Sequence, residues 1–329
     1  MDFQHIVGHE DIIRHFKASI EMNRVSHAYI LCGEADSGRR SLALSFAKTL
    51  QCEEGKIDPC NHCKSCVQVD SGSHPDIIFV EHEKPQLISV DDIRQNVVNT
   101  IDIKPYSGKY KIYIIEDGEM MNVAAQNSLL KTIEEPPEYG IIIILTTTLD
   151  RLLPTIISRC ITLSTKPVKE RDIYDYLVEN FKLDDKKASF CVEYAQGNLG
   201  KAIKLATNED YDRLVKSVIH LETNIYKMDA EAVAAVIEDC DKHYKITMGE
   251  YLDLMMVWYR DILMLKVTGK IDKIMFKDQY KTIMEQAKYL SFNELEDKSR
   301  AIEKAKIRLA ANAKLDDIMK LLIMTLKEI

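Results

Sequence analysis

Four cysteines within residues 52–66 form the most specific chemical pattern in the chain. The segment reads CEEGKIDPCNHCKSC and supplies Cys52, Cys60, Cys63 and Cys66. Two CxxC steps and one further thiolate offer the four sulfur ligands that structural Zn²⁺ takes in tetrahedral sites. We predict a structural zinc site at these residues, with an iron–sulfur cluster as the chemical alternative and His62 as a bystander. The clustering favours a metal site in a reducing compartment over a disulfide framework.

The segment LCGEADSGRRS has the outline of a phosphate-binding loop. Gly33 and Gly38 hold its two glycine places, between an apolar strand-like run and a helical pattern. A working loop continues with a lysine that reaches the phosphates and a hydroxyl that binds Mg²⁺. Here Arg39 stands in the lysine place and Arg40 in the hydroxyl place, and Ser41 comes one position too late. We interpret the loop as degenerate, non-functional and empty of nucleotide; the alternative is a plain strand-to-helix turn.

Two acids end the apolar run IYIIEDG, where P-loop ATPases carry an Asp for Mg²⁺ and often a Glu for the attacking water. The order is reversed here, with Glu116 in the Asp place and Asp117 in the Glu place. One methylene more or less displaces a carboxylate by about an ångström, which is enough to impair catalytic positioning. We interpret the pair as a degenerate Walker B element; a solvated strand end is the alternative.

Arg159, in the segment PTIISRC, follows the fourth strand-like run. An arginine presented near a sheet edge can act as a finger that stabilises the charge on the γ-phosphate in a neighbouring subunit's site. That effect is worth about 10³- to 10⁵-fold in rate. The alternative for a single arginine is a surface ion pair.

Apolar runs that alternate with helical patterns predict one doubly wound α/β domain with five parallel strands, at residues 27–32, 76–80, 111–116, 141–147 and 161–164. After Pro167 the pattern is helical to the end. We expect three domains, namely 1–165 with the zinc insert at 52–66, a small helical domain at 166–208, and an all-α domain at 209–329.

Local signals place several helix ends. Ser89 and Asp92 have the spacing of a capping box, and Pro136 with Pro137 ends the helix AAQNSLLKTIEE. The last helix is amphipathic, with one apolar face made of Leu315, Ile318, Leu322 and Leu326.

Charge and hydropathy exclude some classes of protein. The formal net charge is −8, which argues against a chain that grips nucleic acid by itself, and so against a zinc-dependent DNA-binding protein. No apolar run approaches the roughly 20 residues of a membrane helix, and the start MDFQHIVGHE lacks a signal-peptide layout. We expect a soluble cytoplasmic protein.

Taken together, these motifs resemble the clamp-loader branch of the AAA+ ATPases, the subunits of the bacterial DNA polymerase III clamp loader. The resemblance lies in HAYILCG, the insert with four cysteines, the run NSLLKTIEEPP and the triplet SRC, and it covers nearly the whole chain. It implies an AAA+ core, a small lid and a helical collar that assembles with γ/τ and delta subunits. The assembled complex opens the β sliding clamp and loads it on primer–template DNA.

Departures from the ATP-hydrolysing γ/τ pattern imply a subunit of the delta-prime type. Besides GRR and ED, Gly200 stands where γ/τ carries a sensor arginine, with Lys201 adjacent, while Arg159 is intact. Such a subunit is part of the polymerase holoenzyme without being an ATPase itself, and Arg159 acts in trans on ATP and Mg²⁺ bound by γ/τ. Residues 146–148 lie at the sensor strand of this family, and without a competent loop we assign them no catalytic role. The alternative is an active γ/τ-like ATPase.

Overall fold

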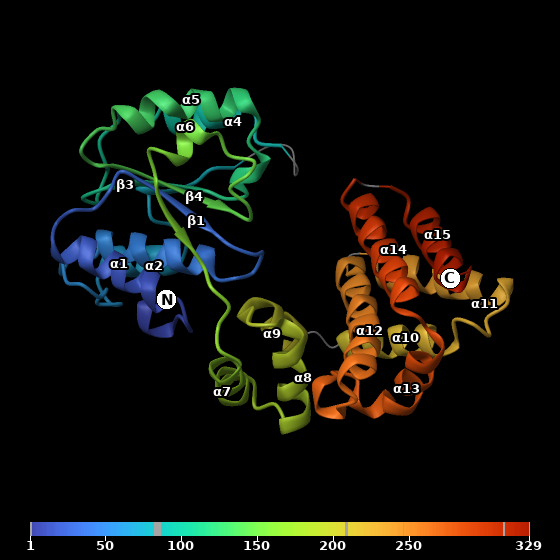
Figure 1. The fold of residues 1–329 in the computed structure, drawn as a ribbon. Helices are drawn as coiled ribbons and strands as arrows, with labels where there is room; N and C mark the ends of the chain where they lie inside the picture. Colours follow the sequence, from blue (N-terminus) through green and yellow to red (C-terminus); the bar gives the residue numbers. More distant parts are fainter. Residues whose placement is uncertain (1, 82–86, 208–209, 246, 312, 329) are drawn as a thin grey trace. The chain divides into compact units, whose positions relative to one another are not determined.

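The computed structural model describes residues 2–81, 87–207, 210–245, 247–311 and 313–328. It consists of two compact units, Met1–Lys204 and Leu205–Ile329, and each is described by itself (Figure 1). The domain boundary expected after residue 208 lies outside the described residues, so the division into three domains stays a prediction.

Within the described part of the first unit, five strands form one parallel sheet. Their spatial order is β2 (Ile77–Phe79), β3 (Lys111–Ile115), β4 (Gly140–Thr146), β1 (Ala28–Cys32) and β5 (Ile161–Ser164). The predicted α/β fold class is confirmed, and each strand falls within one residue of its expected bounds at either end.

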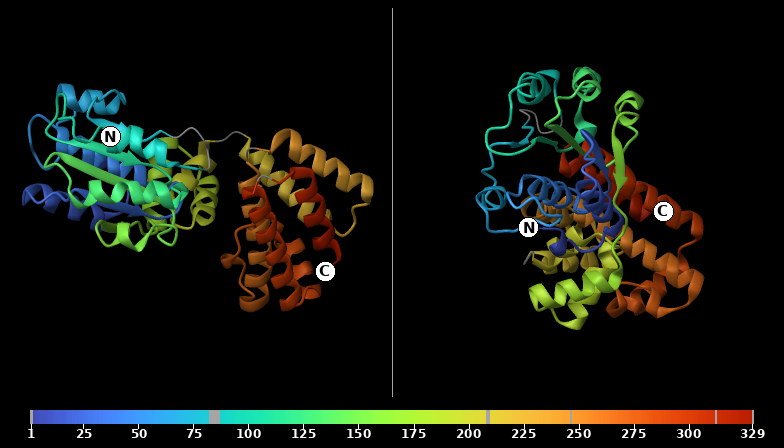
Figure 2. Two further views of the ribbon diagram at one scale, coloured as in Figure 1. Left: turned by 90° about the horizontal axis from the view of Figure 1, so that it is seen from above. Right: turned by 90° about the vertical axis from the view of Figure 1, so that its left-hand side faces the viewer.

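Helices cover both faces of this sheet, as Figure 1 and the two further views of Figure 2 show. Side chains of a strand point alternately to the two faces. Tyr29 therefore packs with Phe16 and Phe46 of the helices on one face, whereas Ile30 packs with Leu129 and other helical residues on the opposite face. The helices and helical turns of this unit are η1 (Phe3–His5), α1 (Glu10–Glu21), α2 (Arg39–Gln51), α3 (Lys64–Asp70), α4 (Val90–Ile93), η2 (Arg94–Val98), η3 (Gly118–Met120), α5 (Val123–Glu134), α6 (Pro154–Ile157), α7 (Glu170–Phe181) and α8 (Asp185–Ala195).

The local helix signals act as predicted. Ser89 and Asp92 form both hydrogen bonds of a capping box at the start of α4. Helix α5 ends at Glu134, one residue before the two prolines, because proline at these positions cannot continue the helical hydrogen bonds.

The described residues after β5 are all helical or irregular, as predicted. Helix α9 (Leu199–Thr207) spans the boundary between the units. The second unit contains α10 (Tyr211–Asn224), α11 (Ala230–His243), α12 (Met248–Thr268), η4 (Ile271–Lys273), η5 (Lys277–Gln279), α13 (Tyr280–Tyr289), α14 (Phe292–Ala310) and α15 (Leu315–Glu328). All four apolar residues predicted for one face of α15 are buried.

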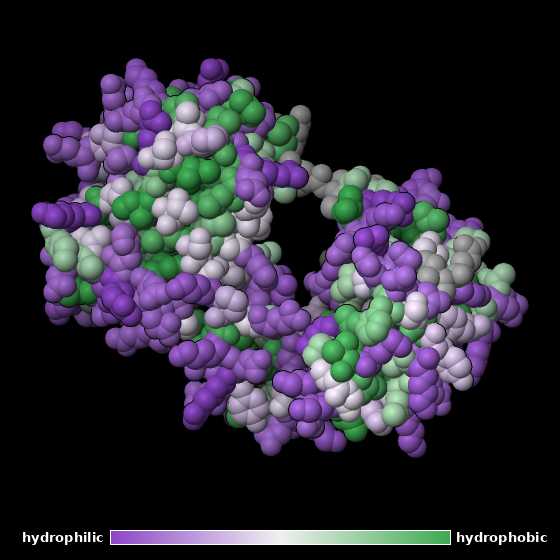
Figure 3. Space-filling view, viewed as in Figure 1, coloured by the Kyte–Doolittle hydropathy of each residue, from purple (hydrophilic) through white to green (hydrophobic). Residues whose placement is uncertain are grey.

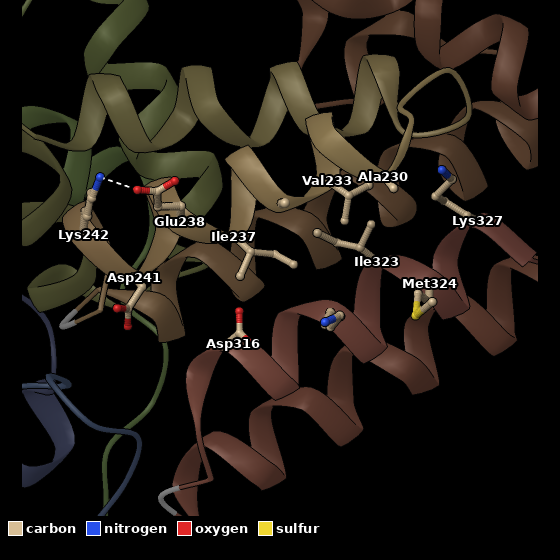
Figure 4. Close-up of a pocket in the computed structure, with 12 residues that line it drawn as sticks. Ala230, Val233, Ile237, Glu238, Asp241, Lys242, Asp316, Ile323, Met324 and Lys327 are labelled. Carbon is tan, nitrogen blue, oxygen red and sulfur yellow. Dashed lines mark hydrogen bonds and ion pairs between the residues drawn. The ribbon is translucent and has the colours of Figure 1, made fainter.

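Most of the surface in the view of Figure 3 is polar, with apolar side chains grouped between polar ones on each unit. In the second unit a groove of about 820 Å³ lies between α11 and α15 (Figure 4). Its floor is apolar, with Ile237 and Ile323 facing each other, and charged residues form its rim. Among the described helices, none has the length and apolar character needed to cross a membrane.

Candidate functional site

The predicted phosphate-binding loop connects β1 to α2. Gly38 caps the start of α2 in a left-handed conformation with φ of 87°, which glycine adopts without strain. Gly33 is held by a hydrogen bond from its N–H to the carbonyl of Thr146 on the neighbouring strand β4. A Cβ atom at Gly33 would lie 1.8 Å from Oγ1 of Thr165, so only glycine fits there. The loop therefore keeps the backbone outline that its sequence predicts.

The two arginines that follow differ in their surroundings. Arg40 Nη1 lies 2.7 Å from Oε2 of Glu116, and its guanidinium lies 4.5 Å from the centre of the Phe79 ring. Arg39 is partly buried, and its Nη1 has no hydrogen-bond partner among the residues that the structure describes. The structure thus joins the residue in the hydroxyl place directly to the residue in the metal-binding acid place.

The second predicted acid does not join this pair. Asp117 is exposed and adopts a left-handed conformation, with φ of 49°, at the turn after β3. The sequence analysis missed Glu119, which accepts hydrogen bonds from the hydroxyls of Thr146 and Thr147 and from the N–H of Thr147. Burial opposes ionisation of Glu119, but these hydrogen bonds keep its pKa below the ordinary value. A carboxylate four residues beyond the end of β3, together with the run of threonines at the end of β4, was the available signal.

Polar side chains near the start of α9 hold the loop from the other side. Asn198 donates to the carbonyl of Ala35 at 2.8 Å and to Glu34 at 3.3 Å. Lys201 Nζ lies 3.3 Å from Glu34, and Lys204 Nζ lies 2.5 Å from Asp36. The hydrogen bond from Asn198 and the charge of Lys201 lower the pKa of Glu34. The acids of the loop thereby neutralise the lysines of this helix.

Gly200 lies against the loop backbone. A Cβ atom there would come within 2.3 Å of the carbonyl oxygen of Asp36, a distance that real Cβ atoms do not show. Because the loop occupies the space where a side chain would begin, no arginine fits at this position in the conformation described. The glycine is therefore required by packing.

A cavity of about 360 Å³ lies beside the loop. Its lining includes Gly33, Ser37, Thr165 and Asn198. The cavity is thus bordered by the loop, by the segment after β5, and by the residues before α9.

Arg159 lies between α6 and β5, and its guanidinium is held at two nitrogens. Nε lies 2.8 Å from Oε1 of Glu134, the last residue of α5. Nη1 donates to the carbonyl of Thr155 at 3.0 Å and to Oγ of Ser158 at 3.3 Å. The side chain keeps 39% of its surface exposed. The sequence analysis did not single out Glu134, although it lies in the run NSLLKTIEEPP that carried the family resemblance.

The four predicted metal ligands come together. The sulfurs of Cys52, Cys60, Cys63 and Cys66 all lie within 4.8 Å of one another, and those of Cys60 and Cys66 are 3.9 Å apart. Four sulfurs at the usual Zn–S length around a tetrahedral ion would be about 3.8 Å apart. None of these thiols is in a disulfide. The arrangement fits a zinc ion.

Backbone N–H groups donate hydrogen bonds to the sulfurs of the cluster, which favours their thiolate form. The N–H groups of Cys60, Cys63 and Cys66 donate to the sulfurs of Cys52, Cys60 and Cys63, respectively. Such donors stabilise thiolates around a metal ion. His62 lies outside the set of four, with its ring bonded to the carbonyl of Cys60 and to Glu54.

Comparisons with known proteins indicate the family to which the chain belongs. The model of the family described as DNA polymerase III, delta subunit, matches residues 8–169. The chain is 30% identical to the DNA polymerase III subunit delta' of Bacillus subtilis over 313 residues, which cover 94% of this chain and 93% of that protein. It is 31% identical over 240 residues to the tau/gamma subunit of Haemophilus influenzae, and this match covers 69% of the chain and 34% of that longer protein.

Among solved structures, a DNA polymerase III gamma subunit-related protein from Thermotoga maritima matches with a TM-score of 0.48 and 19% identity, covering 97% of this chain and 99% of that one. The decisive relationship is the sequence match to the Bacillus subtilis subunit, which extends over nearly all of both chains. The chain belongs to the family of DNA polymerase III delta-prime subunits.

Proposed function

We propose that this chain acts in DNA replication as a non-hydrolysing, delta-prime-type subunit of a DNA polymerase III clamp loader in the cytoplasm. It would assemble with γ/τ and delta subunits into the complex that loads the β sliding clamp onto primer–template DNA. ATP and Mg²⁺ would be bound by γ/τ, so the chain belongs to the polymerase holoenzyme without being an ATPase itself. Membership of the delta-prime family supports the clamp-loader role.

The observation that carries the non-hydrolysing part is the ion pair between Arg40 and Glu116. In a P-loop ATPase the residues at these two places bind the same Mg²⁺ ion. Here a guanidinium supplies the positive charge that the acid would otherwise draw from a metal. The loop and the degenerate Walker B acid are thus balanced without Mg²⁺.

Two further contacts support the same proposal. Glu34 and Asp36 of the loop already pair with Lys201 and Lys204, so these lysines have less charge to offer to a phosphate. A sensor arginine would not fit at Gly200. We therefore propose that the empty loop serves as a fixed contact surface for the helical segment that follows.

The second part of the proposal concerns Arg159, which we take to act in trans on the ATP of a neighbouring γ/τ subunit. Its guanidinium forms an ion pair with Glu134 of α5 and donates a hydrogen bond to the carbonyl of Thr155 of α6, and its side chain is partly exposed. A guanidinium held in this way can offer its remaining N–H groups to a phosphate of another chain without losing its anchor.

For the cysteine cluster we propose structural Zn²⁺ held by Cys52, Cys60, Cys63 and Cys66. The ion would fix the insert through four bonds, without an open position for chemistry. The buried Lys48 of the P-loop helix α2 pairs with Asp70 of α3, and this contact anchors the insert to the core.

We also propose the three-domain division, with an AAA+ core at 1–165, a lid at 166–208 and a collar at 209–329. The helical second unit supports a separate collar. The lid is packed on the core through the loop contacts described above.

The test is a reconstituted complex of this chain with γ/τ and delta subunits. Arg159→Ala should leave the complex assembled while slowing its ATP hydrolysis. Arg39→Ala, which alters the degenerate loop of the same chain, should leave turnover unchanged. Calorimetry of the isolated chain with Mg²⁺ and ATP should show no binding.

The rival is an active γ/τ-like ATPase, in which Arg39 holds phosphate. Within the described part of the chain Nη1 of Arg39 has no hydrogen-bond partner, and this favours the rival. Mg²⁺-dependent turnover by the isolated chain that Arg39→Ala abolishes would establish the rival. Unchanged turnover of the complex with Arg159→Ala would overturn the trans role.

A further inference from the structure

We propose that Glu134 is a positioning residue for Arg159, which orients the guanidinium toward the ATP of the neighbouring subunit. The inference rests on the proposed trans role of Arg159, and it names the residue on which that role depends. Glu134 would not touch the nucleotide itself.

The geometry provides two fixed points on one guanidinium. Glu134 Oε1 lies 2.8 Å from Nε, while the carbonyl of Thr155 accepts from Nη1 at 3.0 Å. The ion pair at Nε and the hydrogen bond at Nη1 together restrict where the guanidinium can lie. Among the described residues, none bonds to the third nitrogen, Nη2. This leaves one donor group free for an external phosphate.

The elements that carry the two fixed points are themselves held together. Leu129 and Ile133 of α5 and Ile156 of α6 belong to one buried cluster under the same face of the sheet. Core packing therefore sets the distance between the backbone at the end of α5, where Glu134 begins, and the backbone of Thr155. The guanidinium of Arg159 contacts both Glu134 and Thr155, so its position depends on this packing.

The ion pair between Glu134 and Arg159 is largely exposed, which indicates that it orients Arg159 and adds little to the stability of the fold. The side chains of Arg159 and Glu134 are 39% and 46% exposed, and ion pairs of this kind contribute about 0–1 kcal/mol to folding. Catalytic effects of misplacement are larger, because a shift of about 1 Å can cost about 100-fold in rate. Loss of Glu134 should therefore affect turnover much more than folding.

The charges of the pair define one contrary role, restraint of Arg159 by Glu134. A carboxylate beside a finger reduces its positive potential, so Glu134 would then restrain Arg159, and its removal would raise the rate. Positioning predicts slower ATP turnover when Glu134 is removed, whereas restraint predicts faster turnover, so the experiment distinguishes the two roles.

The experiment measures kcat and KM for ATP of the reconstituted complex, with substitutions in this chain alone. Glu134→Ala should lower kcat by about 10- to 100-fold, with KM for ATP changed by less than about twofold. Glu134→Gln keeps the shape of the side chain and an oxygen near Nε but removes the charge, so its loss should be smaller than that of Glu134→Ala. Glu135→Ala is the matched control, because it removes the same charge at the next residue and should have no effect.

A double variant separates positioning from a structural role. If Glu134 acts only through Arg159, then Glu134→Ala combined with Arg159→Ala should be no slower than Arg159→Ala alone. A further loss in the double variant, or a fall in melting temperature that parallels the loss of rate, would overturn the inference.

The remaining outcomes are also assigned. If Arg159→Ala has no effect on turnover, the proposed trans role fails and the inference fails with it. If Arg159→Ala slows the complex but Glu134→Ala behaves like Glu135→Ala, only the inference fails. Faster turnover with Glu134→Ala would establish restraint and overturn positioning.

Discussion

Arg40 Nη1 lies 2.7 Å from Oε2 of Glu116, so the first turn of α2 is joined directly to the end of β3. The side chains are 58% and 33% exposed, so the pair contributes little to folding, about 0–1 kcal/mol. In the proposed non-hydrolysing role its effect is electrostatic, because it neutralises the acid at the place where a P-loop ATPase binds Mg²⁺. The guanidinium of Arg40 supplies next to Glu116 the positive charge that a metal ion would otherwise supply.

The first prediction follows from this ion pair. Glu116→Gln in this chain should leave ATP turnover of the reconstituted complex within about twofold of wild type, because the acid holds no catalytic metal. The matched control is the same acid-to-amide change at the corresponding acid of γ/τ, which should abolish turnover at that site. A loss of more than tenfold from Glu116→Gln would show that this chain's own site is catalytic.

The features that sequence predicted correctly are local ones. The strands were predictable because runs such as IIIILT are apolar throughout, as buried parallel strands are. The cysteine cluster was predictable because Cys60, Cys63 and Cys66 are close in the chain and a short turn brings their sulfurs together. In both cases the information lies within a few consecutive residues.

The features that it missed depend on pairing between distant segments. Arg40 and Glu116 are 76 residues apart, and their contact requires the placement of α2 over β3. Glu134 meets Arg159 only because α5 and α6 pack on the same face of the sheet. The sequence shows that Gly200 replaces a sensor arginine. It does not show that the loop backbone packs against Gly200, because that contact depends on the tertiary fold.

The second prediction concerns zinc. The native protein should contain one Zn²⁺ per chain, and Cys63→Ser should lose it, because a hydroxyl is a poor replacement for a thiolate ligand. Removal of the ion should unfold the insert, since structural Zn²⁺ typically contributes about 10 kcal/mol or more. Elemental analysis and thermal unfolding measure the two effects.

Cys32→Ser is the control for this experiment, because Cys32 ends β1 outside the cluster and should retain full zinc content. Iron in place of zinc in the native protein would favour the cluster alternative. Protein that lacks metal yet unfolds at the same temperature would contradict a structural metal site altogether.

The third prediction concerns Gly200. Gly200→Ala should destabilise the first unit by about 1–3 kcal/mol, because the added methyl group meets the backbone carbonyl of Asp36 and forces the loop or α9 to move. Chemical unfolding followed by circular dichroism measures the loss. Gly249→Ala serves as the matched control, since nothing lies within 4 Å of a Cβ atom there and helical alanine is favoured over glycine. Equal stability of the two variants would show that the loop does not press on α9.

The fourth prediction concerns pH and a buried acid in the second unit. Glu222 is fully buried, and burial raises its pKa to about 8, although a hydrogen bond from Tyr259 and the charge of Lys298 act in the opposite direction. The folded state therefore holds this proton up to higher pH than the unfolded state does. The contribution to stability is fully present below the unfolded pKa and is lost as pH rises through about 8.

Unfolding of this unit can be followed selectively, because the single tryptophan of the chain, Trp258, is buried there. Its indole N–H donates to Gln286, and Gln286 donates to the backbone carbonyl of Glu222, so the probe is connected to the acid. The interval from pH 5 to pH 8.5 covers most of the span between the unfolded pKa of Glu222 and its folded pKa of about 8. Over this interval the free energy of unfolding of the wild type should fall on the order of 3 kcal/mol. Glu222→Gln stays neutral and should lose much less over this range. The exposed Glu303→Gln should follow wild type, and a Glu222→Gln profile with the wild-type slope would show that another group governs the pH dependence.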